Sequence, residues 1–283
     1  MEYFELNNGI KMPMEGLGTF LLSPAEAEES VLHALRDGYR LIDTANAYMN
    51  ERGVGRGIVR SGVRREDIFL VTKLWPTEYE DGDKAIADTL ARLGTDYVDL
   101  LILHQPVGSF MAGYRAMERA CRAGKVRALG LSNFPEEQLR EVLAECEIVP
   151  QMVQVEAHPY YPQTELKKLL AEHKMALMAW YPLGHGDKSL IREKVFTRLA
   201  GKYGKSNAQV ILRWHIQVGN VVIPGSKNPE HIKSNLDIFD FSLTAEEIAE
   251  IAKLDKGVRY YNMSLEDAAK TYLSIDLDFN AQP

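Results

Sequence analysis

The chain has 283 residues, with 33 lysines and arginines against 40 aspartates and glutamates, so its formal net charge is −7. This length can bury a large core, and a mildly acidic balance without a basic stripe argues against nucleic acid or an anionic membrane as the main partner. The first residues lack a signal-peptide pattern and no apolar run could span a membrane, so we expect a soluble, cytoplasmic protein. Cys121 and Cys146 lack CxxC spacing and predict reduced packing thiols.

In chain order, the predicted elements are a β-hairpin and then alternating strands and helices. The hairpin consists of EYFEL and IKM, joined at Asn7-Asn8-Gly9, because Asn-Gly favours positive φ. Segments such as 25–38, 82–94 and 136–146 carry apolar residues three and four apart, which is typical of amphipathic helices. Short apolar runs predict eight strands, at 16–19, 40–43, 68–73, 98–104, 126–132, 152–156, 175–180 and 220–224.

The repeating βα unit predicts a parallel sheet, and eight units predict a closed (β/α)8 TIM barrel rather than an open doubly wound sheet. We find no linker or low-complexity segment, so we expect one α/β domain over residues 1–283. From about Lys256 onward, polar and aromatic residues mix without a clear period, which predicts a C-terminal loop.

A polar or aromatic residue ends most of the predicted strands. Because the carboxyl ends of all the strands of a parallel barrel open onto one face, these side chains are expected to converge there. A single one of them is equally well explained as a helix cap or a satisfied core group, but the whole set favours a site, because buried charge is costly unless it is paired or used. The strand-end residues are Asp43, Lys73, His104, Ser132, Asn133, Gln154, Glu156 and Trp180.

Four of the polar residues suit the reduction of a carbonyl group. Tyr48, five residues after Asp43, is a weak acid with a reference pKa near 10, and a lysine cation nearby would lower that pKa. Asp43 can hold Lys73 charged, and a neutral His104 can hydrogen-bond a carbonyl oxygen. This set needs a hydride source. No paired nucleophile and no HExxH or CxxC metal motif is present.

The glycine-rich segment GVGRG at 53–57 does not supply a dinucleotide site of the Rossmann type. It lacks GxGxxG spacing and no predicted strand immediately precedes it, so we interpret its glycines as helix-packing positions. A nicotinamide would instead lie across the barrel mouth. There Trp180 could stack on its ring, and Ser132, Asn133 and Gln154 could bond its carboxamide.

The sequence resembles the aldo-keto reductase family from the hairpin to about Asp255, most closely the bacterial branch of the 2,5-diketo-gluconate and methylglyoxal reductases. The segments that carry the resemblance are GYRLIDTANAYMNERGVGRGI, VTKLWP, LILHQP, LGLSNF, VQVEAHPYYPQ, AWYPLGHG and VIPGSKNPEHIKSNLDIFDFSLT. The resemblance implies NAD(P)H-dependent reduction of aldehydes and ketones, including small dicarbonyl or sugar-derived compounds, by a monomer without a metal. It implies the catalytic residues Tyr48, Lys73, Asp43 and His104.

The resemblance also implies two sets of binding residues. Phe20, Tyr48, Trp75, His104 and Gln105, with residues of the C-terminal loop, are expected to line the substrate pocket. The residues expected to bind cofactor are Thr19, Phe20, Asp43, Ser132, Asn133, Gln154, Trp180, Tyr181, Leu183, Ser226, Lys227, Asn228, His231 and Asn235.

Three departures from the family pattern bear on the cofactor and the pocket. Gly225 and His231 stand where the family usually carries a lysine and an arginine that meet the 2′-phosphate of NADP, so we expect use of both NADP(H) and NAD(H). Lys227 could partly substitute, and NADP(H) affinity should fall as His231 loses its proton at higher pH. Gln105 replaces a common aromatic and should make the pocket more polar. Tyr181 replaces a common small residue and could be packing alone.

Two other classes of function remain open from the sequence. The first is a catalytically weak, cofactor-binding regulatory or structural relative, since a fold does not fix a function. The intact set of Asp43, Tyr48, Lys73 and His104 argues against it. The second is a barrel enzyme acting on phosphorylated sugars, which would need a phosphate site after the seventh and eighth strands, where we expect cofactor instead.

Overall fold

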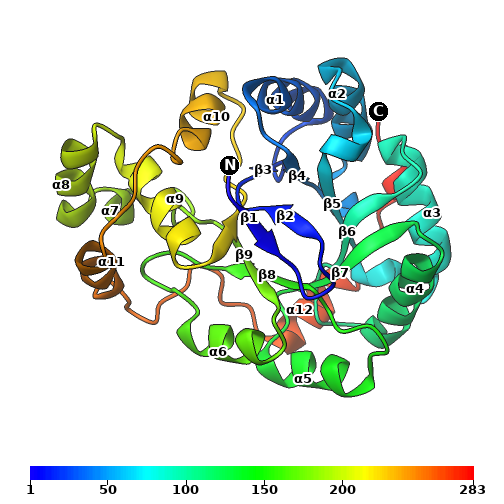
Figure 1. The fold of residues 1–283 in the computed structure, drawn as a ribbon. Coiled ribbons are helices and arrows are strands. Elements are labelled where there is room, and N and C mark those ends of the chain that lie inside the picture. The colour runs from blue at the N-terminus through cyan, green and yellow to red at the C-terminus, as the bar shows by residue number, and fades with distance from the viewer.

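The computed structural model describes residues 1–283, which form a closed parallel barrel with an N-terminal hairpin across one end (Figure 1). The strands run in the sheet order β10-β9-β8-β7-β6-β5-β4-β3, each parallel to its neighbour. Parallel bridges from Glu15 to Val222 and from Gly18 to Gly225 join the first barrel strand to the last. The predicted (β/α)8 barrel is therefore confirmed.

All eight predicted barrel strands and the hairpin are present in the predicted order. The hairpin strands pair in antiparallel register, with Gly9 in the turn at a φ of 82°. The strands are β1 Tyr3–Glu5, β2 Lys11–Pro13, β3 Leu17–Gly18, β4 Leu41–Asp43, β5 Phe69–Leu74, β6 Val98–Leu103, β7 Val126–Ser132, β8 Met152–Glu156, β9 Ala176–Trp180 and β10 Asn220–Val222.

Helices surround the barrel on its outer side (Figure 1). Local signals explain their ends: Ser23 and Glu26 form a capping box at the start of α1, and Gly38 ends the helix in the left-handed conformation. The α-helices are α1 Pro24–Asp37, α2 Glu51–Ser61, α3 Gly82–Leu93, α4 Phe110–Arg122, α5 Glu136–Glu145, α6 Thr164–Glu172, α7 Lys188–Ile191, α8 Lys194–Tyr203, α9 Asn207–Gln217, α10 Pro229–Leu236, α11 Ala245–Ala252 and α12 Leu265–Tyr272. Short 3-10 turns are η1 Asn46–Tyr48, η2 Arg65–Asp67, η3 Pro76–Glu78 and η4 Phe279–Ala281. No helix has the length and apolar character that crossing a membrane requires.

The glycines of the GVGRG segment pack α2 against its neighbours, as the sequence predicts. A Cβ at Gly53 would lie 2.1 Å from the carbonyl oxygen of Pro24, and one at Gly55 would lie 2.4 Å from that of Leu93. Only glycine allows these close approaches of backbone to backbone.

The prediction of a loop from Lys256 onward is wrong for residues 265–272, which form α12. The Ser264 side chain accepts a hydrogen bond from the backbone N–H of Asp267, which is the usual capping arrangement at a helix start. The helix is short and mostly exposed, so it lacks the long apolar stripe from which helices are predicted.

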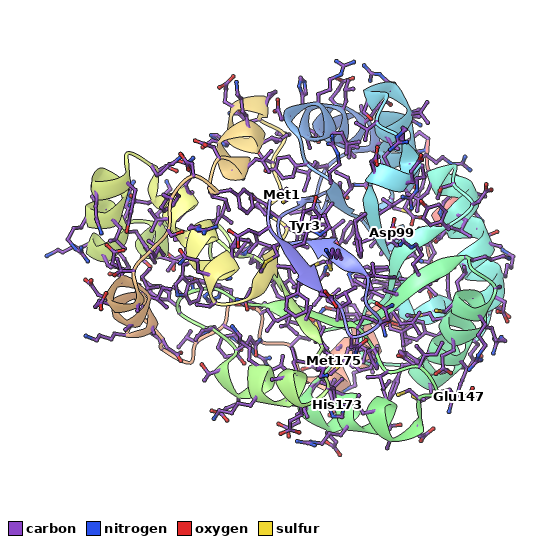
Figure 2. The ribbon with its side chains drawn as sticks, viewed as in Figure 1. Met1, Tyr3, Asp99, Glu147, His173 and Met175 are labelled. Carbon is purple, nitrogen blue, oxygen red and sulfur yellow. The ribbon has the colours of Figure 1, made fainter.

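The end of the barrel that carries the hairpin is closed by packed side chains. Figure 2 shows this end, with Met1 and Tyr3 on the N-terminal segment in front of the strands. Asp99, at the start of β6, accepts a hydrogen bond from the Leu70 N–H and forms ion pairs with Arg65 and Arg127. These contacts stabilise this end of the barrel.

One buried carboxyl group, that of Glu15, lowers the free energy of unfolding at high pH. Glu15 is fully buried, neither of its carboxylate oxygens has a hydrogen-bond partner, and burial raises its pKa well above the usual range. The nearby Tyr39 hydroxyl donates to the carbonyl oxygen of Ile232 instead. A folded-state pKa raised in this way gives stability that is fully present below the unfolded pKa and is lost as pH rises through the folded pKa.

We therefore expect Glu15→Leu to increase the free energy of unfolding at pH 8 by about 1–3 kcal/mol, since it removes a buried polar group without a partner. Glu15→Gln should flatten the fall in stability between pH 5 and 9, because it cannot titrate. Denaturant titrations of both variants and the parent across this range measure the effect. Destabilisation by Leu at pH 8 together with an unchanged pH profile for Gln would contradict this account.

Candidate active site

The open end of the barrel collects the strand-end residues that the sequence singles out. Asp43 ends β4, Lys73 lies in β5, and His104 follows β6 directly. Ser132 ends β7, and Gln154 lies in β8. Because the strands are parallel and in register, these five side chains face one mouth.

Asp43 and Lys73 form a buried ion pair at this mouth. Lys73 Nζ donates to Asp43 Oδ1 over 2.6 Å and to the carbonyl oxygen of Thr44 over 2.8 Å. The other oxygen, Asp43 Oδ2, accepts from Gln154 Nε2 over 2.9 Å. Burial raises the pKa of Asp43 and lowers that of Lys73, while the charge of each partner opposes the shift. Two of the three Lys73 N–H groups are thus engaged, and one remains for a further acceptor.

Tyr48 lies beside this pair, on the 3-10 turn η1 that follows β4. Lys73 Nζ is 4.9 Å from the centroid of the Tyr48 ring, and the centroid of the Phe20 ring is 5.1 Å from it. The expectation that Lys73 lowers the Tyr48 pKa is wrong for this state: burial, and then the charge of Asp43, raise that pKa well above its ordinary value. The phenol therefore holds its proton at neutral pH, as a proton donor must.

His104 lines the same cavity as an uncharged imidazole. Its pKa is held well below the usual value, first by burial and then by the charge of Lys73. Nδ1 is buried without a hydrogen-bond partner, and the ring contacts Trp75 edge-on at 5.1 Å and Tyr48 at 5.6 Å. A neutral imidazole carries one N–H, which suits it to donate to a carbonyl oxygen next to the Tyr48 hydroxyl.

A single cavity of about 750 Å³ connects these residues with the segment after β10. Most of the residues predicted to touch cofactor or substrate line it, namely Phe20, Asp43, Tyr48, Trp75, His104, Gln105, Ser132, Asn133, Gln154, Trp180, Tyr181, Leu183, Ser226 and Lys227. Five predicted residues are not in its wall. Lys73 lies behind Tyr48, and the others are Thr19, Asn228, His231 and Asn235.

The polar part of the wall fits the carboxamide of a nicotinamide ring. Asn133 accepts from Trp180 Nε1 at 3.0 Å, which fixes the indole beside the cavity. Gln154 Nε2 donates to Asp43, so the side-chain oxygen of Gln154 remains free to accept from an amide N–H. Ser132 brings a hydroxyl to the same wall. Tyr181, which also lines the cavity, meets the Trp180 ring edge-on at 4.7 Å.

The far end of the cavity, around Ser226 and Lys227, carries little free positive charge. Lys227 Nζ forms an ion pair of 2.9 Å with Glu26 on α1. That bond, before any other cause, lowers the pKa of Glu26 to about 2. The three other residues expected to bind cofactor here belong to α10 or its cap. Asn228 caps the helix by accepting a hydrogen bond from the Glu230 N–H, Asn235 is buried in the helix, and His231 is exposed on it.

The sequence missed which residues of the C-terminal stretch complete the cavity. Tyr261, Tyr272, Ile275 and Leu277 all line it, together with His185 from the loop after β9. The expectation that C-terminal residues line the pocket is confirmed, but their identity depends on tertiary contacts rather than on a local pattern. Thr19, by contrast, donates its hydroxyl to the carbonyl oxygen of Asp43 and shapes the backbone behind the site.

Comparisons with known proteins show the family to which the chain belongs. The Aldo/keto reductase family model matches residues 16–256. An aldo-keto reductase of Mycolicibacterium smegmatis is 46% identical over 90% of this chain and 94% of its own length. The methylglyoxal reductase of Escherichia coli is 39% identical over 90% of this chain and 94% of its own length. A Bombyx mori aldo-keto reductase solved in complex with NADP is 32% identical, with a TM-score of 0.88 over 96% of this chain and 97% of that one. This chain is therefore an oxidoreductase and belongs to the aldo/keto reductase family.

Proposed function

We propose that the protein reduces aldehydes and ketones to alcohols, including small dicarbonyl and sugar-derived compounds, with either NADPH or NADH. The observation that carries this proposal is the convergence of a protonated Tyr48, the buried Asp43–Lys73 pair and a neutral His104 on one cavity. A reduced nicotinamide bound along the wall formed by Ser132, Asn133, Gln154 and Trp180 would supply the hydride.

His104, Tyr48 and Lys73 then orient the carbonyl group and bring about the proton transfer to its oxygen. His104 donates a hydrogen bond to the carbonyl oxygen and orients it toward Tyr48. Tyr48 gives its proton to that oxygen as negative charge develops on it. Lys73, held by Asp43 at 2.6 Å, stabilises the phenolate that remains, since one of its N–H groups is free for it.

The experiment that tests this function is a substrate screen with both cofactors. Purified protein is mixed with NADPH or NADH and with methylglyoxal, phenylglyoxal or an aldose, and the loss of reduced-nicotinamide absorbance is followed. Turnover that needs the carbonyl compound supports the proposal. Cofactor binding without turnover of any carbonyl compound would instead support the catalytically weak regulatory or structural relative.

The use of both cofactors rests on the charge at the far end of the cavity. Gly225 contributes no charge, and Lys227, the one cation in that part of the wall, is paired with the Glu26 carboxylate. A 2′-phosphate at this end would compete with Glu26 for Lys227, whereas a 2′-hydroxyl would not. An affinity for NADPH that far exceeds that for NADH would contradict dual use.

Glu26→Gln is expected to improve NADPH affinity by about three- to fivefold, because the pair that it breaks is exposed and therefore weak. NADH affinity should change less than twofold. Glutamine still completes the capping box of α1, so the fold is preserved. Cofactor titrations by protein fluorescence measure both affinities. Glu29→Gln, on the same helix but paired with Arg60, is the matched control and should change neither. If Glu26→Gln improved the affinities for NADPH and NADH equally, this role of Glu26 would be refuted.

A further inference from the structure

The C-terminal tail, residues 256–283, is fastened across the barrel mouth. Trp75 Nε1 donates to the carbonyl oxygen of Tyr272 over 3.1 Å, and the rings of the two residues meet edge-on at 4.9 Å. The hydroxyls of Tyr261 and Tyr272 are hydrogen-bonded to each other. The Tyr260 hydroxyl donates to Asp187 over 2.6 Å, in the loop after β9. The tail therefore forms a wall of the cavity rather than a free end.

Glu156, the last residue of β8, also holds the tail. The sequence predicts it as a strand-end residue at the barrel mouth, and the proposed carbonyl reduction does not use it. Glu156 Oε1 accepts from the Tyr260 N–H over 2.6 Å, and Oε2 accepts from the Tyr261 N–H over 3.0 Å. His158 Nε2 lies 2.9 Å from Oε1, and its ring is fully buried. Glu156 itself is 3% exposed. Although burial raises the pKa of Glu156, these three bonds leave it below the usual value, so the carboxylate is charged.

A charged, buried carboxylate that accepts two consecutive backbone N–H groups fixes the position of that backbone. Bonds to a charged acceptor are about twice as strong as neutral ones and are shorter. The two residues held in this way carry side chains with different tasks. Tyr260 reaches Asp187, and Tyr261 lines the cavity with its ring 6.1 Å from Trp180. The Glu156 carboxylate thus places an aromatic ring edge-on beside the indole that borders the proposed nicotinamide site.

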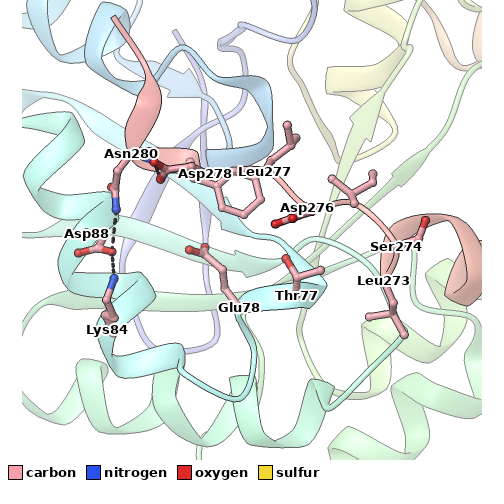
Figure 3. Close-up of a pocket in the computed structure, with 12 residues that line it drawn as sticks. Thr77, Glu78, Lys84, Asp88, Leu273, Ser274, Asp276, Leu277, Asp278 and Asn280 are labelled. Atoms are coloured by element: carbon pink, nitrogen blue, oxygen red, sulfur yellow. Dashed lines mark hydrogen bonds and ion pairs between the residues drawn. The ribbon is translucent and has the colours of Figure 1, made fainter.

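The far end of the tail is fastened independently of Glu156 (Figure 3). Asn280 donates to Asp88 over 3.1 Å and accepts from Arg92 Nη1 over 2.7 Å. Between the two ends, the tail passes over Thr77 and Glu78 and leaves a hollow of about 430 Å³ with several carboxylates. No group of His, Cys, Asp or Glu there is arranged to hold a metal ion. Loss of the Glu156 contacts would therefore loosen the backbone at Tyr260 and Tyr261, while the Asp187, Asp88 and Arg92 contacts keep the tail attached.

We propose that Glu156 is a positioning residue that sets substrate selectivity by seating Tyr261 over the cavity. The inference rests on the proposed carbonyl reduction and names a substrate class for it: carbonyl compounds with an aromatic or other flat apolar group next to the reacting carbonyl. Such a group reaches the Tyr261 ring and buries its surface there. A carbonyl compound with only a methyl group reaches Tyr48 and His104 and gains nothing from Tyr261.

The test compares Glu156→Gln with the parent enzyme on phenylglyoxal and methylglyoxal at saturating NADPH. Glutamine offers one acceptor oxygen in place of two, so one of the two tail N–H bonds is lost. We expect the KM for phenylglyoxal to rise about tenfold, consistent with loss of one bond to a charged group. The kcat for both substrates and the KM for methylglyoxal should stay within twofold. Hydrogen exchange at 258–263 should become faster, while exchange at 279–283 should not.

Glu118→Gln is the matched control, because Glu118 makes the same kind of contact elsewhere. Its Oε1 accepts from the N–H groups of Glu147 and Ile148, and the side chain is 1% exposed on α4, away from the cavity. We expect this variant to lose stability without any change in the ratio of the two KM values. The same unchanged ratio in Glu156→Gln would overturn the proposal.

Two further measurements keep the proposal testable. If Glu156→Gln does not fold, Tyr261→Ala removes the ring directly and should raise the KM for phenylglyoxal alone, and equal effects on both substrates would overturn the proposal. If the parent enzyme turns over no carbonyl compound in the substrate screen, the proposed function fails. Hydrogen exchange at 258–263 in the variant then still decides whether Glu156 holds the tail.

Discussion

Replacing Tyr48 with phenylalanine is expected to lower kcat by about a hundred- to ten-thousandfold, the usual contribution of a general acid. The ring remains, so its contacts with Phe20 and with the Lys73 ammonium persist. Only the proton that would go to the carbonyl oxygen is lost. Steady-state rates with methylglyoxal and NADPH measure the effect.

Two measurements separate a catalytic loss from a structural one in this variant. The affinity for NADPH and the thermal midpoint should stay close to those of the parent, because the hydroxyl is not needed for packing. Phe20→Leu, which removes the neighbouring ring, serves as a control and should change KM far more than kcat. Retention of more than a tenth of the parent kcat in Tyr48→Phe would rule out Tyr48 as the proton donor.

Lys73→Met should destabilise the protein by about 3–5 kcal/mol, the usual cost of leaving one member of a buried ion pair without its partner. Lys73 is fully buried and Asp43 is 1% exposed, so solvent cannot replace the lost charge. In the variant the pKa of Asp43 rises further, because the cation that opposed the effect of burial is gone. The deficit should therefore shrink as pH falls toward 4 and the carboxyl takes up a proton.

The double variant Lys73→Met, Asp43→Leu provides the control for this prediction. It removes both charges, and replacing a buried pair by apolar residues of similar size is often neutral. The double variant should regain most of the free energy of unfolding that Lys73→Met loses. It should not regain the turnover of the parent. Denaturant titrations of the parent, of Lys73→Met, of the single variant Asp43→Leu and of the double variant at pH 4 and pH 8 give the coupling energy. A double variant less stable than Lys73→Met alone would contradict the account.

The barrel and its mouth were predictable because they depend on local patterns. Each strand is a short apolar run, and Asp43, Lys73, His104 and Ser132 stand at or near strand ends, where parallel topology sends them to one face. Asp43, Lys73 and His104 are close together for that reason alone. The glycines of α2 were predictable in the same way, since GVGRG lacks both the spacing and the preceding strand of a nucleotide loop.

The remaining features depend on contacts between distant segments. Glu156 and Tyr261 are about a hundred residues apart in sequence, so no periodicity connects them. The pairing of Lys227 with Glu26 likewise joins two segments with no shared motif. The direction of the Tyr48 pKa was missed because it is raised first by burial and then by the charge of Asp43, and a sequence shows neither the burial nor that proximity.

The most direct test of the central claim is to follow the hydride itself. The protein is incubated with phenylglyoxal and NADPH that carries deuterium at the transferring position of the nicotinamide ring, and the product is examined by mass spectrometry. We predict an alcohol with one deuterium at the former carbonyl carbon, formed about a hundredfold or more faster by the parent than by Tyr48→Phe. An alcohol without deuterium, or equal product from both proteins, would contradict carbonyl reduction by this site.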